Sequence, residues 1–295
     1  MLSGIEKIIF IILALICSFM AYVTFSRMFG VISSGTQPLS LSQILSNWKN
    51  GFYSFISQKT LFKTRPIIGL IHALVAWGFT LYLVVNIIDV LYGFIPGFRF
   101  LPNHLFGHLY RVFVDVFSVL VLLGVFYFLY RRFIQNDQKL KIEKPVMLSE
   151  SAIKGMRYDS MIVGFFIIIH VGARFLSASF EIAHAGPDST QPFANLFAKL
   201  WINMEPRSII FMEHVTWWIA LGLILLFLPY FPMSKHAHLF MGPINIMGKE
   251  VRKSMGALEK IDFEDDTIEQ FGSSRLHHLP QNQLLDGYAC IQCSR

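Results

Sequence analysis

Cysteine is scarce in this sequence. Only three of the 295 residues are cysteine, namely Cys17, Cys290 and Cys293. Three cysteines cannot build a framework of disulfides, so the composition excludes a disulfide-stabilised domain and does not indicate an oxidising compartment. Cys17 lies within a long apolar run, where we expect an inert packing thiol. The other two stand close together near the end of the sequence.

Charged residues are also few. They make up 15% of the chain, whereas hydrophobic residues make up 54% and the mean hydropathy is +0.52. A soluble domain usually has more charge and less apolar sequence. The sequence contains no Gly-rich phosphate loop and no basic–aromatic nucleic-acid motif, and its net charge of +6 lies largely in short loops beside apolar runs. We therefore expect contact with membrane lipid and no nucleic-acid partner.

Long apolar blocks are what the sequence has in abundance. Five of them are long enough to cross a bilayer, which takes about 20 helical residues; they cover residues 8–29, 66–92, 109–133, 160–180 and 208–231. Helices are expected because open strand edges leave backbone groups unpaired in lipid. The first block is too long for a signal peptide and no small-residue cleavage site follows it. The predicted fold is all-α, a polytopic membrane bundle of five transmembrane helices.

Basic residues are distributed unevenly among the loops. The loops after the first and third blocks are rich in Lys and Arg, whereas the other two loops carry three basic residues between them. Basic loops remain on the cytoplasmic side. We therefore predict an outside N-terminus, a cytoplasmic C-terminus and a multi-pass location in the inner (cytoplasmic) membrane of the cell. In the outer loop at 181–207, the stretch FANLFAKLWIN indicates either a short amphipathic helix or an ordinary loop.

The sequence becomes polar after residue 245. We predict a membrane domain at residues 1–245, a linker at 246–280 and the start of another domain at 281–295. This last segment ends with the pair Cys290 and Cys293. A Cys-x-x-Cys pair in a cytoplasmic segment is typical of half a zinc site, of a redox pair or of the start of an iron–sulfur motif. The remaining ligands would lie beyond Arg295.

Several histidines lie in or beside the predicted spans. Ionisable residues at membrane depth are usually functional, and imidazoles from facing helices commonly hold haem iron in helical bundles. His72 lies near the cytoplasmic end of the second span, and His236 and His238 follow the fifth span near the same face. We therefore predict that His72 and one histidine of this pair bracket a haem. Two residues apart, His236 and His238 point to different sides of a helix, so at most one is expected to bind iron.

The outer half of the membrane has its own candidates. His170 is the histidine nearest to mid-membrane and His214 lies about one turn into the fifth span. The 22 residues from His214 to His236 correspond to about 33 Å of helix, so an outer haem would be a second one. The alternative for a lone histidine such as His72 is a hydrogen bond to a neighbouring helix. For His236 and His238, it is a polar collar at the membrane interface.

Two charged residues in the spans are further candidates. Asp115 follows Arg111 by four residues, a spacing that allows an ion pair on one helix face. Asp115 is interpreted either as a proton relay to a quinone or as the neutralising partner of Arg111. Arg174 follows His170 by one turn, and we expect it to pair with a haem propionate or with Glu181.

Three motifs resemble a known family. They are HALVAWGF at 72–79, FPMSKHAHLF at 231–240 and FGSSRLHHLPQNQLLDGYACIQCSR at 271–295. Together they resemble membrane-bound iron–sulfur oxidoreductases of the heterodisulfide reductase-like type. In these, a five-helix cytochrome b module similar to the nitrate reductase gamma subunit precedes a ferredoxin-like domain. The resemblance covers nearly the whole chain and implies that it is the N-terminal part of a longer protein.

The resemblance implies electron transfer between a membrane quinone, menaquinone or ubiquinone, and cytoplasmic iron–sulfur clusters through b-type haem. It implies electron-transfer flavoprotein, another redox subunit or a thiol–disulfide couple as the soluble partner. It places His238 at the inner haem ligand position, and Cys290 and Cys293 in a [4Fe–4S] motif. The same pattern expects an outer histidine at the position of Ala220 and another near Tyr82 and Asn86.

The sequence departs from the family pattern at that outer site. We therefore expect one haem b, and a second one only if His170 and His214 have taken over the outer position. Two other functions remain as alternatives. One is a haem-free membrane anchor for a soluble redox domain, and the other is an ion-translocating subunit that uses Asp115 and Arg174, although no internal repeat or broken-helix pair supports the latter.

Overall fold

The computed structural model describes residues 2–102, 104–141, 148–249, 263–264 and 272–291. Over these ranges the regular structure is helical, without strands, which confirms the predicted all-α class. Five helices are long and apolar enough to cross a membrane: Gly4–Ser33, Pro66–Phe94, Leu105–Ile134, Glu150–Ala185 and Pro206–Phe227. The five predicted spans are confirmed, and four of the helices extend beyond their predicted bounds, whereas the fifth ends at Phe227, before its predicted end at residue 231. The orientation of the termini stays a prediction.

The described residues fall into two compact units. Unit 1 contains residues 2–22 and 60–231, and unit 2 contains residues 23–59 and 232–291. Helix α1 (Gly4–Ser33) contributes its first part to unit 1 and its remainder to unit 2. The predicted boundaries at residues 245 and 280 stay predictions.

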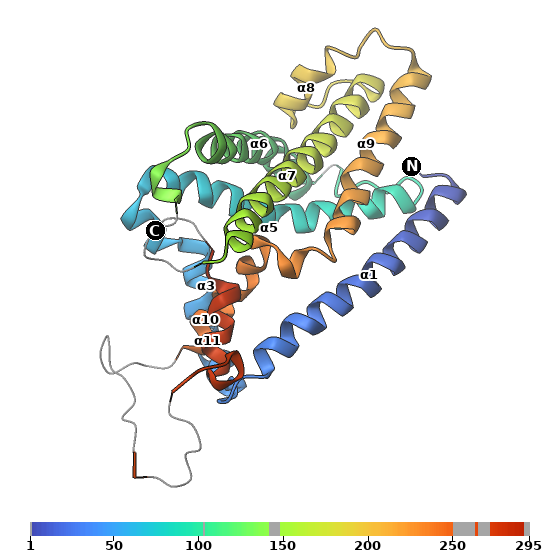
Figure 1. Ribbon diagram of the computed structural model, residues 1–295. Helices are drawn as coiled ribbons and strands as arrows, with labels where there is room; N and C mark the ends of the chain where they lie inside the picture. Colours follow the sequence, from blue (N-terminus) through green and yellow to red (C-terminus); the bar gives the residue numbers. More distant parts are fainter. Residues whose placement is uncertain (1, 103, 142–147, 250–262, 265–271, 292–295) are drawn as a thin grey trace. The chain divides into compact units, whose positions relative to one another are not determined.

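Unit 1 contains α4 (Lys59–Thr64, from Thr60 on) and the long helices α5 (Pro66–Phe94), α6 (Leu105–Leu129), α7 (Glu150–Ala185) and α9 (Pro206–Phe227), with the short α8 (Pro192–Ala198). Helix α6 continues as a π-helical turn, Tyr130–Ile134, and a 3₁₀ turn follows at Gln138–Leu140. Proline occupies the first turn of α5, α8 and α9, where its missing N–H leaves no bond unmade. Helix α7 packs against α6, α8 and α9, and runs beside α9 in Figure 1.

The core of unit 1 lies among its four long helices. Val85 from α5, Val114 from α6, Val171 from α7 and Phe227 from α9 belong to one buried cluster. The helices approach closely at small residues, as membrane helices commonly do. At Gly78, for example, any Cβ would collide with the side chain of Val121 on α6.

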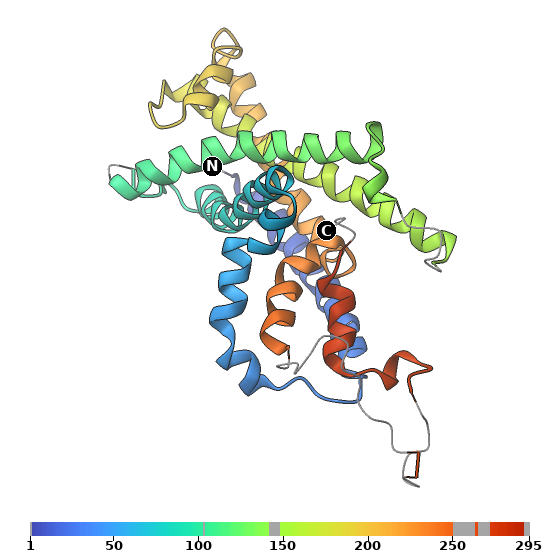
Figure 2. The same ribbon diagram turned by 90° about the vertical axis from the view of Figure 1, so that its left-hand side faces the viewer.

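Unit 2 consists of short helices around α10 (His238–Gly248). These are α2 (Leu41–Ser46), α3 (Trp48–Ser57) and α11 (Gln281–Ala289), together with 3₁₀ turns at Phe231–Met233 (from Pro232 on), Lys235–Ala237 and Leu276–His278. Figure 2 shows α10 between α3 and α11, and α10 packs against both. The buried cluster here includes Met28 and Ile32 from α1, Ala237, Met241 and Leu285. The described part of the predicted linker has little regular structure, and residues 250–262 and 265–271 lie outside the described ranges.

Candidate redox site

The histidines of the SKHAH motif lie in unit 2 at the start of α10. Ser234 caps the short 3₁₀ turn, because its Oγ accepts a hydrogen bond of 3.1 Å from the backbone N–H of His236. His236 is 7% exposed. Burial, followed by the neighbouring His238 and Lys235, lowers the pKa of His236 to about 3. Its imidazole is therefore neutral, which is the form that binds a metal.

His238 is the first residue of α10 and is half-buried. Its Nδ1 lies against the backbone carbonyl of Lys235, three residues earlier. A carbonyl only accepts, so Nδ1 donates and the lone pair of the neutral ring is on Nε2. This arrangement, in which one ring nitrogen is held by a carbonyl, is common among histidines that bind iron or zinc through the other.

Helices α10 and α11 form an antiparallel pair. Asn245 Nδ2 donates a hydrogen bond of 2.7 Å to Asp286 Oδ1. Nearer the start of α10, a Cβ on Gly242 would lie 4.0 Å from the carbonyl oxygen of Ala289. The contacts therefore run in opposite order along the two helices. The end of α11, which precedes Cys290, lies on the side where α10 begins at His238.

Cys290 follows α11 as its C-cap residue and is exposed. Cys293 lies outside the described residues, so the geometry of the predicted pair is not described. In the part of the chain that the structure describes, no group of three or more His, Cys, Asp or Glu side chains is arranged to hold a metal ion. The iron–sulfur assignment of Cys290 and Cys293 therefore stays a prediction.

His170 lies on α7 in the core of unit 1 and is 4% exposed. Its Nδ1 donates a hydrogen bond of 2.9 Å to the backbone carbonyl of Ala220 on α9. Its Nε2 is buried and has no hydrogen-bond partner among the described residues. Buried polar atoms are rarely left unpaired without a reason. A buried imidazole with an unpaired lone pair suits one axial ligand of an iron, so His170 fits the outer position.

The partner of His170 is informative. Ala220 is the position at which the family pattern expects an outer histidine, and here its backbone carbonyl holds a histidine from another helix. The second histidine of the pattern is expected near Tyr82 and Asn86 on α5, and the ring of Tyr82 contacts His170 edge-on with 5.5 Å between ring centroids. Ala220, Tyr82 and His170 thus meet at one place in unit 1.

His214 is held elsewhere. Its Nδ1 lies 2.9 Å from Glu6 Oε1, which also accepts a hydrogen bond from Trp218 Nε1. His214 precedes Ala220 by six residues, or about 9 Å along α9. His170 and His214 are therefore held by different partners, and the position of His214 on α9 differs from that of Ala220, which holds His170. Their pairing around an outer haem stays a prediction.

His72 lies on α5 in unit 1 and is half-buried, with contacts to its surroundings. Its predicted partners, His236 and His238, belong to unit 2. The bracketing of an inner haem by His72 and His238 therefore stays a prediction.

Asp115 does not pair with Arg111, so that one of its two interpretations was wrong, whereas its role as a proton relay to a quinone stays a prediction. Asp115 is 2% exposed, and its two carboxylate oxygens accept the backbone N–H groups of Phe193 and Ala194 at 2.8 and 2.9 Å. These donors belong to the first turn of α8, whose orphan N–H groups need acceptors. Asp115 thus acts as a cap for α8 supplied by α6, a contact that spacing along α6 could not indicate.

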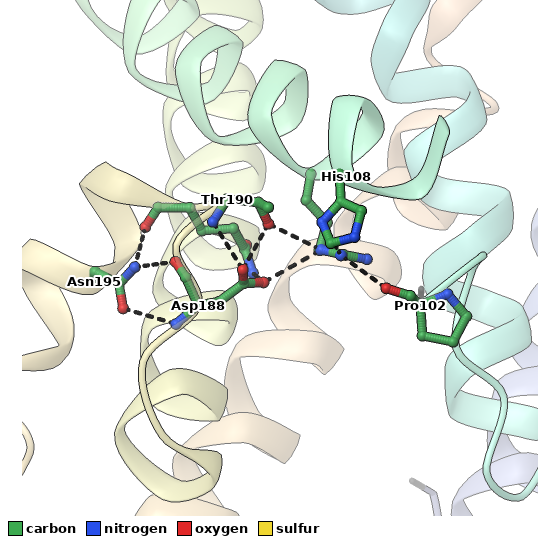
Figure 3. Close-up of polar contacts among 7 residues, drawn as sticks. Pro102, His108, Asp188, Thr190 and Asn195 are labelled. Atoms are coloured by element: carbon green, nitrogen blue, oxygen red, sulfur yellow. Dashed lines mark hydrogen bonds and ion pairs between the residues drawn. The ribbon is translucent and has the colours of Figure 1, made fainter. Parts of the chain in front are cut away.

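Arg111 instead contacts the loop before α8. Its Nε lies 3.3 Å from Asp188 Oδ2 and donates to Thr190 Oγ1 at 3.0 Å, within the network drawn in Figure 3. Burial raises the pKa of Asp188, but hydrogen bonds from Thr190 and Gln191 and the charge of Arg111 outweigh this and hold it below its ordinary value. The loop is therefore anchored by an ionised carboxylate.

Arg174 pairs with Asp89 on α5 rather than with Glu181, so the expected pairing with Glu181 was wrong, whereas pairing with a haem propionate stays a prediction. Its Nε lies 3.2 Å from Asp89 Oδ2, whereas Glu181 Oε1 accepts the hydroxyl of Tyr92 at 3.2 Å. Sequence reasoning did not single out Asp89. The signal was present, because an acidic residue inside a predicted span is a site candidate by itself.

Two curated proteins match the chain. It is 32% identical over 257 residues to the "Probable iron-sulfur-binding oxidoreductase FadF" of Bacillus subtilis, an alignment that covers 84% of this chain and 32% of that protein. It is 25% identical over 252 residues to the "EtfAB:quinone oxidoreductase" of Syntrophomonas wolfei, with 84% of this chain and 34% of that protein covered. The chain is thus related to iron–sulfur oxidoreductases.

The chain spans about a third of the length of the curated relatives it matches. No model of a known protein family matches it. No solved structure matches it either.

Proposed function

We propose that the chain is the membrane segment of a quinone-linked iron–sulfur oxidoreductase, and that it carries electrons between the quinone pool and cytoplasmic iron–sulfur clusters. Its five apolar helices and its relation to iron–sulfur oxidoreductases, one of them named for quinone, support this. The cell's inner membrane is its proposed location. Electron-transfer flavoprotein, which the name of one relative contains, is the proposed soluble partner, and a thiol–disulfide couple is the alternative.

The antiparallel pair of α10 and α11 carries the proposal. It belongs to a single unit that contains the SKHAH histidines at the start of one helix and Cys290 at the end of the other. An electron carrier held by these histidines and a cluster bound at Cys290 would therefore be on the same side of unit 2. Short separation between carriers is what electron transfer needs.

We assign the inner haem b to His238, with His236 as the alternative ligand and His72 as the second one. We assign an outer haem to His170, whose unpaired Nε2 supports it, with His214 as the other candidate ligand. When bound, a b-type haem supplies a one-electron carrier within the membrane. The protein's own contribution is to orient two of these imidazoles, because backbone carbonyls accept from Nδ1 of His238 and of His170 and leave Nε2 for iron.

The decisive experiment measures haem in the purified full chain. A pyridine haemochrome assay gives the haem-to-protein ratio, and a reduced-minus-oxidised spectrum shows whether the haem is low-spin. We expect His238→Ala to lose the inner haem, and we expect the matched variant His277→Ala, at an exposed position of the same unit, to retain it. An unchanged spectrum in His238→Ala would overturn the inner assignment.

The same preparation tests the alternative function. A purified wild-type chain with no Soret band would support a haem-free membrane anchor for a soluble redox domain.

A further inference from the structure

A cavity of about 480 Å³ opens in unit 1 where α5 and α7 end and where α6 and α9 begin. Its volume lies within the range of about 300–1,000 Å³ that is typical of small-molecule sites. It is lined by both apolar and charged side chains, and Ala220, whose carbonyl holds His170, is one of its lining residues. The cavity is therefore next to the candidate outer haem ligand.

Apolar side chains line part of the cavity. They include Trp217 and Leu221 from α9 and Ile88 from α5. Trp217 is fixed by a hydrogen bond of 3.1 Å from its Nε1 to the carbonyl of Asp89. Its ring lies against Gly93, where a Cβ would come within 2.8 Å of it. A fixed indole ring among the lining residues suits a planar ligand ring.

The buried ion pair of Arg174 and Asp89 also lines the cavity. The two side chains are 15% and 19% exposed. Among the described residues, only the Nε of Arg174 makes a hydrogen bond, to Asp89. The terminal amino groups of the guanidinium therefore remain as donors, while Asp89 neutralises its charge.

Tyr110 supplies another donor. Its hydroxyl is buried and has no hydrogen-bond partner in the described part of the chain. Its ring is fixed edge-on against Phe100, with 5.0 Å between the ring centroids. A buried hydroxyl without a partner is unfavourable unless a ligand or a water molecule completes it.

The charges around the cavity limit what it can bind. Four carboxylates line it, and two of these, Asp89 and Asp188, are already paired with arginines. Glu181 and Glu213 remain, against Arg99, while His214 is held by Glu6. This balance disfavours an anionic ligand such as a phospholipid headgroup. It favours a neutral molecule that accepts hydrogen bonds.

We propose that this cavity binds the ring of a quinone, with Arg174 and Tyr110 as donors to its carbonyl oxygens and Trp217 as the surface against which the ring packs. A quinone ring is planar and neutral and presents two acceptors and no donor, which matches the donors and the apolar side chains. The assignment of a quinone as the ligand rests on the proposed function, whereas the location of the binding site rests on the cavity alone.

The test uses heptyl-hydroxyquinoline N-oxide, a quinone analogue whose fluorescence is quenched on binding, titrated into the full chain in nanodiscs. Tyr110→Phe removes only a hydroxyl that has no partner in the described structure, so the fold is retained. We expect the dissociation constant to rise roughly fivefold, as for one lost hydrogen bond. The matched control, Tyr158→Phe, alters a residue that is 60% exposed and outside the cavity, and should leave binding unchanged.

Arg174→Gln is expected to weaken binding roughly tenfold or more, because a hydrogen bond from a charged donor is lost. If this variant fails to fold, the Tyr110→Phe variant alone tests the proposed quinone site. A wild-type chain that does not quench the probe, or a Tyr110→Phe variant that binds as the wild type does, overturns the proposed site. Haem reduction by dithionite is measured in the same samples. If the chain contains haem but does not bind the probe, the proposed quinone site is rejected and the proposed function is kept. If the chain contains no haem, the proposed function is rejected.

Discussion

The two units hold their candidate iron ligands in different ways. In unit 2, His236 and His238 are positioned by Ser234 and Lys235, two and three residues away. In unit 1, His170 is positioned by Ala220, which is 50 residues away on another helix. The first arrangement is a local turn and the second exists only when α7 and α9 are packed together. The histidines of unit 2 can therefore be recognised from a sequence motif, whereas the position of His170 has no signature in the neighbouring sequence.

The largest effect is expected from His170→Gln, which tests whether the long-range contact creates an iron ligand. Glutamine can still donate to the carbonyl of Ala220 but is not a haem ligand of the usual kind. We expect the variant to fold and to lose the outer haem, measured as a lower haem-to-protein ratio. The exposed His184 on the same helix provides the control variant His184→Ala. An unchanged ratio and spectrum would show that His170 is only a core residue.

The next effect concerns a second long-range contact of unit 1. Asp115→Asn removes the charge that caps α8 and leaves at least one of the N–H groups of Phe193 and Ala194 without a good acceptor. We expect a loss of about 1–3 kcal/mol in stability, seen as a lower unfolding temperature and as faster hydrogen exchange at residues 192–198. Glu150→Gln is the control, because its ion pair with Lys154 is exposed and worth little. Equal shifts in both variants would contradict the capping role.

The smallest effect is expected in unit 2. Ser234→Ala removes the cap of the turn that carries His236, and such caps contribute about 1 kcal/mol. We expect faster hydrogen exchange limited to residues 235–241, because the defect is local, with the rest of unit 2 unchanged. Ser273→Ala, at an exposed position, serves as the control. A loss of protection throughout unit 2 would show that this turn is not a local element.

Much of the fold was predictable because the membrane imposes it. An apolar run of about 20 residues that enters lipid must pair its own backbone groups, so its helical state follows from the run itself. The starts of helices at Pro66 and near Ser208 were found for this reason. The helix over Pro192–Ala198 was predicted only as one of two alternatives, since its stability depends on Asp115 from α6.

The sequence by itself determined the five spans, the SKHAH histidines and the Cys-x-x-Cys pair as candidates, because spans depend on composition and motifs depend on neighbours along the chain. Only the tertiary structure decided the partners of the buried charges and of His170. Arg174 pairs with Asp89 and not with Glu181, and Asp115 accepts hydrogen bonds from the start of α8 and does not pair with Arg111. A buried charge or imidazole pairs with the group that offers the best hydrogen-bond geometry at its own depth in the helix bundle. The depth of a side chain and the helix that it faces depend on how the helices pack.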